Sequence, residues 1–187
     1  MQARRRWKRR QPGLDPARLV FIDESAAKTN MTRLRGRAPR GQRLHASCPH
    51  GHWRTTTMIA SIRMDGATAC MTIEGATDAD VFRVYVKDIL CPKLRPGDVV
   101  IMDNLSAHKN AQTLALIAAA GAQAAFLPAY SPDLNPIEMM WSKVKASLRR
   151  TEARCADTLL PAIGAALAAV TAKDALHWFA ACGYSFI

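Results

Sequence analysis

Two short, uninterrupted apolar runs, each closed by an aspartate, constrain the fold of this 187-residue chain more than any other feature. They occupy residues 19–23 and 99–103 and end at Asp23 and Asp103. Apolar runs of this length without polar alternation are typical of central strands that are covered on both faces. Functional sites of open α/β sheets lie beyond the carboxyl ends of such strands. The sequence therefore predicts a layered α/β fold in which both aspartates lie at one edge of the sheet.

The segments between and after these runs indicate a mixed sheet flanked by helices. Residues 53–63 and 67–73 have extended patterns on either side of Asp65-Gly66, which is a hairpin signal. Residues 77–91 and 110–120 are predicted to be helical, and residues 122–127 to form a further strand. The order is strand, hairpin, helix, strand, helix, strand and closing helices. It predicts a three-layer fold with five strands, antiparallel early and parallel later.

The length and composition predict one domain preceded by a short basic segment. A chain of 187 residues that is 49% apolar can bury one good core. Six of the first ten residues are basic and surround Trp7, and Pro12-Gly13 follows. Residues 1–18 are therefore expected to be a tail or linker rather than a core element, and residues 19–187 to be the domain. The tail is either a solvated charge run or a segment that lies along phosphates.

The charge favours an anionic partner. The formal net charge is +11 and the isoelectric point is about 10, and such a field attracts a polyanion. A membrane is disfavoured as a partner because no apolar run approaches the roughly 18 residues that would span one. A soluble, intracellular protein is expected. The groups predicted to contact nucleic-acid phosphates lie in four segments: Arg4, Arg5 and Arg6; Arg33, Arg35 and Arg37 in an irregular loop or short edge strand; His108 and Lys109; Lys143 and Lys145.

The spacing of the cysteines and histidines does not indicate a defined metal site. Five cysteines form an odd set without a Cys-x-x-Cys pair, so disulfides are not implied. His45, Cys48, His50 and His52 lie close in sequence, but their spacing fits no standard zinc pattern. Whether that cluster binds metal is left open.

A third acid, Glu138, has a structural explanation that competes with a catalytic one. Asn135 as N-cap, Pro136 as the first helical residue and Glu138 two positions later would form a capping box. Asp23 and Asp103 could likewise be turn residues, and Asp133 is expected to be one. Taken singly, each acid favours the structural role.

Taken together, the three acids indicate a metal site. Hard cations such as Mg²⁺ prefer carboxylate oxygens, and two-metal phosphoryl-transfer sites combine a few acids from separate elements. Two strand ends and one helix start in a strongly basic protein meet this requirement. Asp23, Asp103 and Glu138 are therefore predicted to bring their carboxylates within about 10 Å of one another, close enough to share two ions.

Three segments resemble a known family. Residues 21–24, residues 102–109 and the Tyr-Ser-Pro-x-x-Asn-Pro-Ile-Glu stretch at residues 130–138 are similar to the three acidic motifs of DDE transposases. The resemblance is to the mariner-like branch of bacterial insertion sequences, covers about residues 15–187 and includes the spacing between Asp103 and Glu138.

The resemblance implies a ribonuclease-H-like fold in which Asp23, Asp103 and Glu138 are the catalytic residues and bind two ions of Mg²⁺ or Mn²⁺. It implies cleavage of DNA at the ends of a mobile element and joining of the freed 3′-OH to target DNA, with no covalent protein intermediate. Partners would be DNA and a second copy of the chain, in a homodimer or higher assembly. Members begin with helix-turn-helix modules, so a separate polypeptide would supply them here. A cytoplasmic, nucleoid-associated bacterial location is expected.

Two other functions remain open from the sequence. One is a ribonuclease-H-like nuclease that hydrolyses without joining. The other is a nucleic-acid-binding remnant that keeps its charge but not its chemistry.

Overall fold

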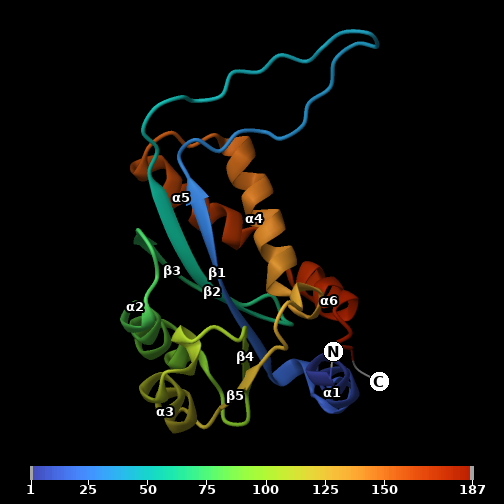
Figure 1. Ribbon diagram of the computed structural model, residues 1–187, viewed down its shortest axis with the longest axis vertical. Coiled ribbons are helices and arrows are strands. Elements are labelled where there is room, and N and C mark those ends of the chain that lie inside the picture. The colour runs from blue at the N-terminus through green and yellow to red at the C-terminus, as the bar shows by residue number, and fades with distance from the viewer. Residues whose placement is uncertain (1, 186–187) are drawn as a thin grey trace.

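A five-stranded sheet in the order β3-β2-β1-β4-β5 forms the middle of the molecule (Figure 1). The structure is a computed structural model and describes residues 2–185. The strands are β1 (Leu19–Lys28), β2 (Thr55–Arg63), β3 (Thr68–Glu74), β4 (Val99–Met102) and β5 (Gln123–Phe126). The helices are α1 (Gln2–Arg10), α2 (Ala79–Val84) with its π-helical continuation Tyr85–Leu90, α3 (Ala111–Ala119), α4 (Ile137–Thr151), α5 (Ala156–Ala168) and α6 (Ala172–Ala181).

The predicted mixed sheet is confirmed. β1 pairs antiparallel with β2 and parallel with β4, and β4 pairs parallel with β5. The β2–β3 hairpin turns at Asp65-Gly66, where Gly66 has φ of +83°. Glycine adopts this left-handed conformation without a steric penalty, which explains the strength of the hairpin signal.

β1 is longer than the apolar run that predicted it. Parallel pairing with β4 ends at Phe21, but antiparallel pairing with β2 continues to Lys28. Asp23 therefore lies inside a strand, opposite Ala60, and not at a strand end. The expectation that this strand ends at Asp23 was wrong because pairing with β2 supports the strand beyond that residue.

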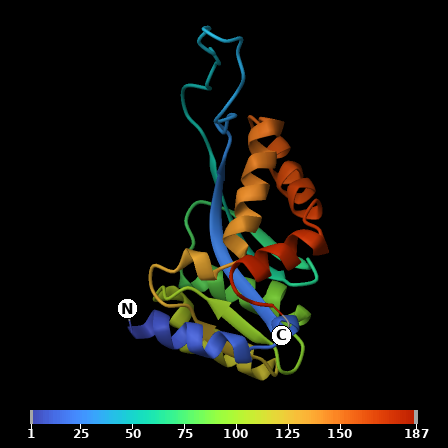
Figure 2. The same ribbon diagram turned by 90° about the vertical axis from the view of Figure 1, so that its right-hand side faces the viewer.

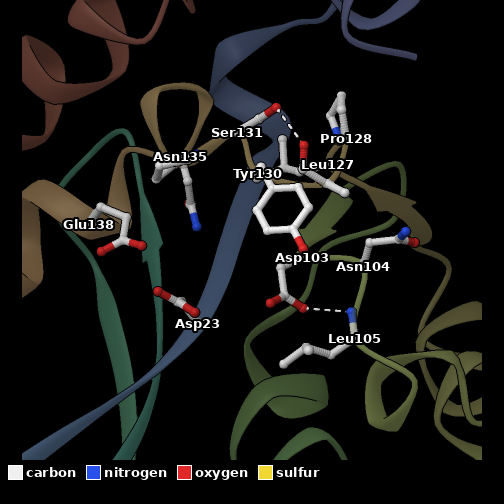
Figure 3. A pocket seen from close by; sticks show the side chains of 12 residues that line it. Asp23, Asp103, Asn104, Leu105, Leu127, Pro128, Tyr130, Ser131, Asn135 and Glu138 are labelled. Carbon is white, nitrogen blue, oxygen red and sulfur yellow. Dashed lines mark hydrogen bonds between the residues drawn. The ribbon is translucent and has the colours of Figure 1, made fainter. Parts of the chain in front are cut away.

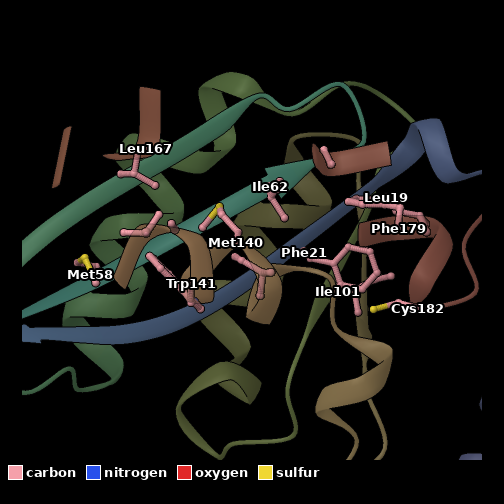
Figure 4. Close-up of a cluster of buried hydrophobic side chains, with 14 of the residues drawn as sticks. Leu19, Phe21, Met58, Ile62, Ile101, Met140, Trp141, Leu167, Phe179 and Cys182 are labelled. Carbon is pink, nitrogen blue, oxygen red and sulfur yellow. The ribbon is translucent and has the colours of Figure 1, made fainter. Parts of the chain in front are cut away.

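Helices cover both faces of the sheet, and alternate residues of β1 point to opposite layers. Leu19 and Phe21 pack with side chains from α4, α5 and α6 (Figure 4). Val20 and Ile22 pack with side chains from α2, its continuation and α3. Both faces of β1 are thus covered by apolar side chains, which explains why polar residues do not alternate with apolar ones in residues 19–22.

Helix α1 corrects the prediction of a tail. Its residue Trp7 is only 7% exposed and joins the core cluster on the α4–α6 face. The Trp7 indole donates a hydrogen bond to the Tyr184 hydroxyl over 3.0 Å, and that hydroxyl donates to the Leu134 carbonyl over 2.9 Å. One indole thus fixes a strongly charged helix. The sequence pattern did not show this because the partner of Trp7 lies 177 residues away.

Residues 29–54 form an arm, exposed from residue 33 onward, that extends from the ends of β1 and β2, away from the rest of the molecule (Figures 1 and 2). This segment has no regular secondary structure, so its arginine-rich stretch is a loop and not a short edge strand, and the strand predicted from residue 53 begins at Thr55. Arg33, Arg35 and Arg37 are exposed on it, and so are His45, Cys48, His50 and His52. We refer to residues 29–54 as the arm.

Within residues 2–185, no single helix is both long and apolar enough to cross a membrane. Only α5 and α6 together reach that length and composition, with a bend of 75° between them, and their buried side chains belong to the core.

Candidate active site

Asp23, Asp103 and Glu138 line one cleft of about 400 Å³ (Figure 3). Asp23 comes from β1, Asp103 follows β4 directly, and Glu138 lies in the first turn of α4. The loop of residues 127–132 and Asn104, Leu105 and Asn135 complete the lining. The structure thus brings the three acids to one place from three separate elements.

The backbone around Asp103 fixes one side of the cleft. Asp103 Oδ1 accepts a hydrogen bond from the Leu105 amide over 2.9 Å, which turns the chain sharply after β4 (Figure 3). This is an Asx-type turn of the kind considered as the structural alternative for Asp103. The turn directs the carboxylate into the cleft, so the structural role and a chemical role coexist.

The capping box that competed for Glu138 does not form. α4 begins at Ile137, and its N-cap Pro136 makes no side-chain capping bond. The backbone N–H of Asn135 instead donates a hydrogen bond to the Pro132 carbonyl, which closes the tight turn Pro132–Leu134. Within residues 2–185 the Glu138 carboxylate has no hydrogen-bond or ion-pair partner. Glu138 is exposed to the cleft, and the structural explanation for it is removed.

Asn135, predicted to be a helix cap, is a buried residue of the cleft. It is 4% exposed, and its Oδ1 has no hydrogen-bond partner among the described residues. The nitrogen end of its side-chain amide is directed toward Asp23 and Glu138 (Figure 3). Buried side-chain oxygens are nearly always paired in folded proteins. An amide without a partner beside two carboxylates is therefore a feature of the site and not of the fold.

The carboxylates of the cleft differ in their electrostatics. Burial raises the pKa of Asp23 to about 7, and the negative charges of Glu138, Glu24 and Asp103 add to that effect. Burial acts in the same direction on Asp103, but contacts with His108 and the Leu105 amide outweigh it and lower its pKa. Asp23 thus lacks the compensating contacts that Asp103 has.

His108, predicted to contact DNA, is fully buried, so that part of the prediction was wrong. Its Nε2 lies 2.9 Å from Glu24 Oε1, and its Nδ1 lies 2.7 Å from Asp103 Oδ1 at an angle poor for a hydrogen bond. Burial opposes the charged imidazole, but the two carboxylates raise its pKa to about 9. His108 therefore links the strand that carries Asp23 to the turn that carries Asp103. The signal for it was its position five residues after Asp103.

Two other predicted phosphate contacts are already paired. Both terminal guanidinium nitrogens of Arg4 bind the carboxylate of Asp133, which lies in the turn Pro132–Leu134 and outside the cleft lining. Lys143 pairs with Asp174 and also donates to the Ala169 carbonyl. The other predicted contacts, Arg5, Arg6, Lys109, Lys145 and the three arginines of the arm, are at least partly exposed.

The donors of the cleft fit a hard cation. Carboxylate and amide oxygens are the ligands that Mg²⁺ and Mn²⁺ prefer, and a cation would relieve the repulsion that acts on Asp23. In residues 2–185 no three His, Cys, Asp or Glu side chains gather tightly enough to enclose one ion. The ligand atoms of the cleft therefore suit a hard cation chemically, but the described side chains line an open cleft and do not enclose an ion.

Tyr130 marks the rim of this cleft. Its side chain is completely exposed, and its φ of +54° is unusual for a residue other than glycine. Left-handed backbone at a bulky residue costs free energy and clusters at functional loops. The loop over the cleft is thus held in a conformation that its own sequence does not favour.

The fold resembles transposase and integrase cores among solved structures. The Mos1 strand transfer complex matches with a TM-score of 0.69 at 17% identity, over 94% of this chain and 54% of that one. A Mos1 mariner paired end complex with Mn matches with a TM-score of 0.64 at 18% identity, over 94% and 54%. The catalytic core of BIV integrase matches with a TM-score of 0.50 at 14% identity, over 81% of each chain.

The chain therefore spans about half the length of the Mos1 chains that it matches. No curated protein sequence matches it. The predicted three-layer, ribonuclease-H-like fold is confirmed by the integrase match and by the sheet.

A family match covers the sheet and the three acids. It extends over residues 18–160, from the start of β1 to within α5, and includes Asp23, Asp103 and Glu138. Its description is DDE superfamily endonuclease. With three acids of three elements in one cleft of this fold, the chain belongs to the DDE superfamily endonucleases.

Proposed function

We propose that this chain is the catalytic domain of a mariner-like transposase, which cleaves DNA strands and transfers them through Asp23, Asp103 and Glu138. The observation that carries the proposal is the convergence of these acids in one cleft of a DDE endonuclease fold. Residues 19–187 form the catalytic domain, and α1 is packed on it. The bacterial insertion-sequence origin and the nucleoid-associated, cytoplasmic location belong to the same proposal.

The proposed cofactor is a pair of Mg²⁺ or Mn²⁺ ions. Mos1 paired end complexes, which this fold resembles, were solved with Mn and with Mg. When bound, such ions activate a water molecule and stabilise the charge that develops at the phosphate. The chain's own part is to present Asp23, Asp103 and Glu138 as ligands. His108 and the Leu105 amide hold Asp103 in place, and Asn135 borders the ligands Asp23 and Glu138.

The proposed partners are the ends of a mobile element, target DNA and at least one further copy of the chain. The similarity to Mos1 strand-transfer and paired-end complexes supports both kinds of partner. The chain spans only 54% of the length of those proteins.

Asp103→Asn tests this function. The substitution removes a charged ligand but almost no volume, so the rate of cleavage and joining of a labelled duplex in Mg²⁺ or Mn²⁺, measured per folded molecule, should fall at least about a hundredfold. Glu138→Gln should behave in the same way. Asp133→Asn is the matched control, because Asp133 lies outside the cleft and should leave the rate per folded molecule intact. Equal rates for Asp103→Asn and the parent would refute the proposal.

The same assay separates the two other functions. A nuclease that only hydrolyses would produce nicked DNA and no joined product at any metal concentration. A binding remnant would shift the DNA in a gel but produce neither product.

A further inference from the structure

A second groove lies beside the active cleft and shares a wall with it. It has a volume of about 420 Å³, and Asn104, Leu127, Pro128 and Ala129 line both hollows. The opposite wall of the second groove is α1, and Phe126 lies between the two walls. We call this hollow the α1 groove. It exists because Trp7 anchors α1 against the body of the protein.

The two hollows carry opposite charge. The active cleft contains three carboxylates, whereas no described residue that lines the α1 groove is acidic. Arg6 and Arg10 line the groove, both are exposed, and neither has an ion-pair partner among residues 2–185. Lys109 adds a third positive charge, with its Nζ 5.8 Å from the centre of the Phe126 ring. A metal-binding acidic cleft thus continues into a groove that attracts anions.

Only one face of α1 lines the groove, so only the charged residues on that face can act in it. Arg6 and Arg10 lie four residues apart on one helical face, so their side chains start roughly 5–6 Å apart. Lys8 and Arg9 are equally basic and exposed, but they do not line the groove. Arg4 neutralises Asp133 and is unavailable. The groove therefore uses two of the six charges of this segment.

We propose that the α1 groove binds the sugar–phosphate backbone of the DNA strand that enters the active cleft, with Arg6 and Arg10 on successive phosphates beside the one that reacts. This site rests on the proposed function. Arginine forks bind phosphate oxygens in pairs, and the apolar ledge of Leu127 and Pro128 offers a surface for the sugars between them. A folded acidic protein would need a wider surface than this narrow groove.

The decisive comparison is between two variants with equal charge. Arg6→Gln/Arg10→Gln removes both groove charges, and Lys8→Gln/Arg9→Gln removes two charges from the same helix outside the groove. Glutamine keeps helix propensity. Each phosphate contact contributes about 0.9 to the slope of log affinity against log salt for duplex DNA. The groove variant should flatten that slope by about 1.8 on a fluorescent duplex, and the control variant by less than half as much.

Two further measurements identify the cause. Arg6→Lys/Arg10→Lys keeps the charge and should retain the parental slope within about 0.5. Matching urea midpoints for all variants ensure that α1 stays docked, and a destabilised glutamine variant is replaced by the single variants. In cleavage assays the groove variant should raise KM at least about threefold and change kcat less than twofold.

Equal slopes for the groove variant and the control variant would overturn the proposal, as would preferential binding of an acidic peptide over DNA. The binding measurement needs no catalysis. A parent without cleavage activity would refute the proposed function and leave the groove testable, whereas equal slopes would refute the groove and leave the cleavage result unchanged.

Discussion

His108 shows how a buried residue can support a site that it does not enter. Its imidazole is enclosed, packs against Phe82 with ring centres 4.3 Å apart, and touches one carboxylate on each of two segments. A buried charged group is stable only when its partners are in place. The Glu24–His108–Asp103 contact therefore resists any shift of Asp103 relative to β1.

Replacing His108 should reveal this role as a loss of stability. His108→Gln removes the ring and leaves Glu24 without its cationic partner, so the free energy of unfolding should fall by roughly 1–3 kcal/mol. Urea denaturation followed by circular dichroism measures the change. Lys109→Gln, at the exposed neighbouring position, should alter the same quantity by less than about 0.5 kcal/mol. Similar losses in both variants would contradict the role assigned to His108.

At the scale of elements, the parts that sequence could predict are those set by local pattern. The hairpin at Gly66, the apolar runs of β1 and β4 and the buried apolar face of α4 are each determined by residues a few positions apart in the sequence. The full length of β1 depends on pairing with β2, the start of α4 on the turn at Pro132, and the docking of α1 on Tyr184. Of the site, the three acids were predictable, but the pairing of His108 and the position of Asn135 required the folded chain.

The docking of α1 can be measured by a double-mutant cycle. Tyr184→Phe removes the hydroxyl between Trp7 and the Leu134 carbonyl and should cost roughly 1–3 kcal/mol, because two buried groups lose a partner. Trp7→Phe should cost a comparable amount. The double variant should cost less than the sum, since both changes break one chain of hydrogen bonds. Trp53→Phe, in the exposed arm, is the control and should be nearly neutral. Strict additivity would show that the two side chains act independently.

A buried ion pair joins the end of β2 to the residue directly before β4. Arg63, at the end of β2, binds Asp98, directly before β4, and both side chains are less than a tenth exposed. Asp98→Asn leaves the Arg63 charge buried without a counter-charge and should cost about 3–5 kcal/mol at pH 7. Glu74→Gln, in the exposed pair with Arg54, should cost less than about 1 kcal/mol.

The pair should also give the stability a defined pH dependence. Burial would raise the pKa of Asp98, but the hydrogen bonds and charges of Arg63 and Arg95 outweigh it and lower that pKa. The stabilisation is therefore complete above the unfolded pKa of about 3.9 and is lost as pH falls through the lower folded value. The difference in urea midpoint between parent and Asp98→Asn should stay constant from pH 7 down to about the unfolded pKa of 3.9 and shrink as the pH falls below that value. A difference that does not shrink below that pH would contradict the assignment.

At the scale of the whole molecule, exposed positive charge lies both on the arm and on α1. The arm extends away from the rest of the molecule (Figure 2) and carries exposed arginines, while α1 carries Arg6 and Arg10 in the groove beside the active cleft. Because no segment of the sequence predicts a helix that reads base edges, contacts through phosphates should dominate binding.

DNA binding should accordingly be tight at low salt and nearly indifferent to sequence. With some six phosphate contacts, log affinity should fall with log salt at a slope of roughly −5. Arg35→Ser/Arg37→Ser should flatten that slope by about 1.8. Lys87→Gln/Lys173→Gln removes two exposed charges from α2's continuation and α6, and should change it little. Strong discrimination between an element-end duplex and a scrambled one would contradict this prediction.

The bond between Tyr184 and Leu134 has a consequence for synthesis of the chain. A ribosome completes the loop above the active cleft 50 residues before it adds the hydroxyl that fixes that loop. All three acids of the cleft are therefore present on the nascent chain for most of that interval, but the loop lacks its support. Firm assembly of the cleft has to wait until Tyr184 leaves the exit tunnel, which separates the time at which the polypeptide can first touch DNA from the time at which its cleft is complete.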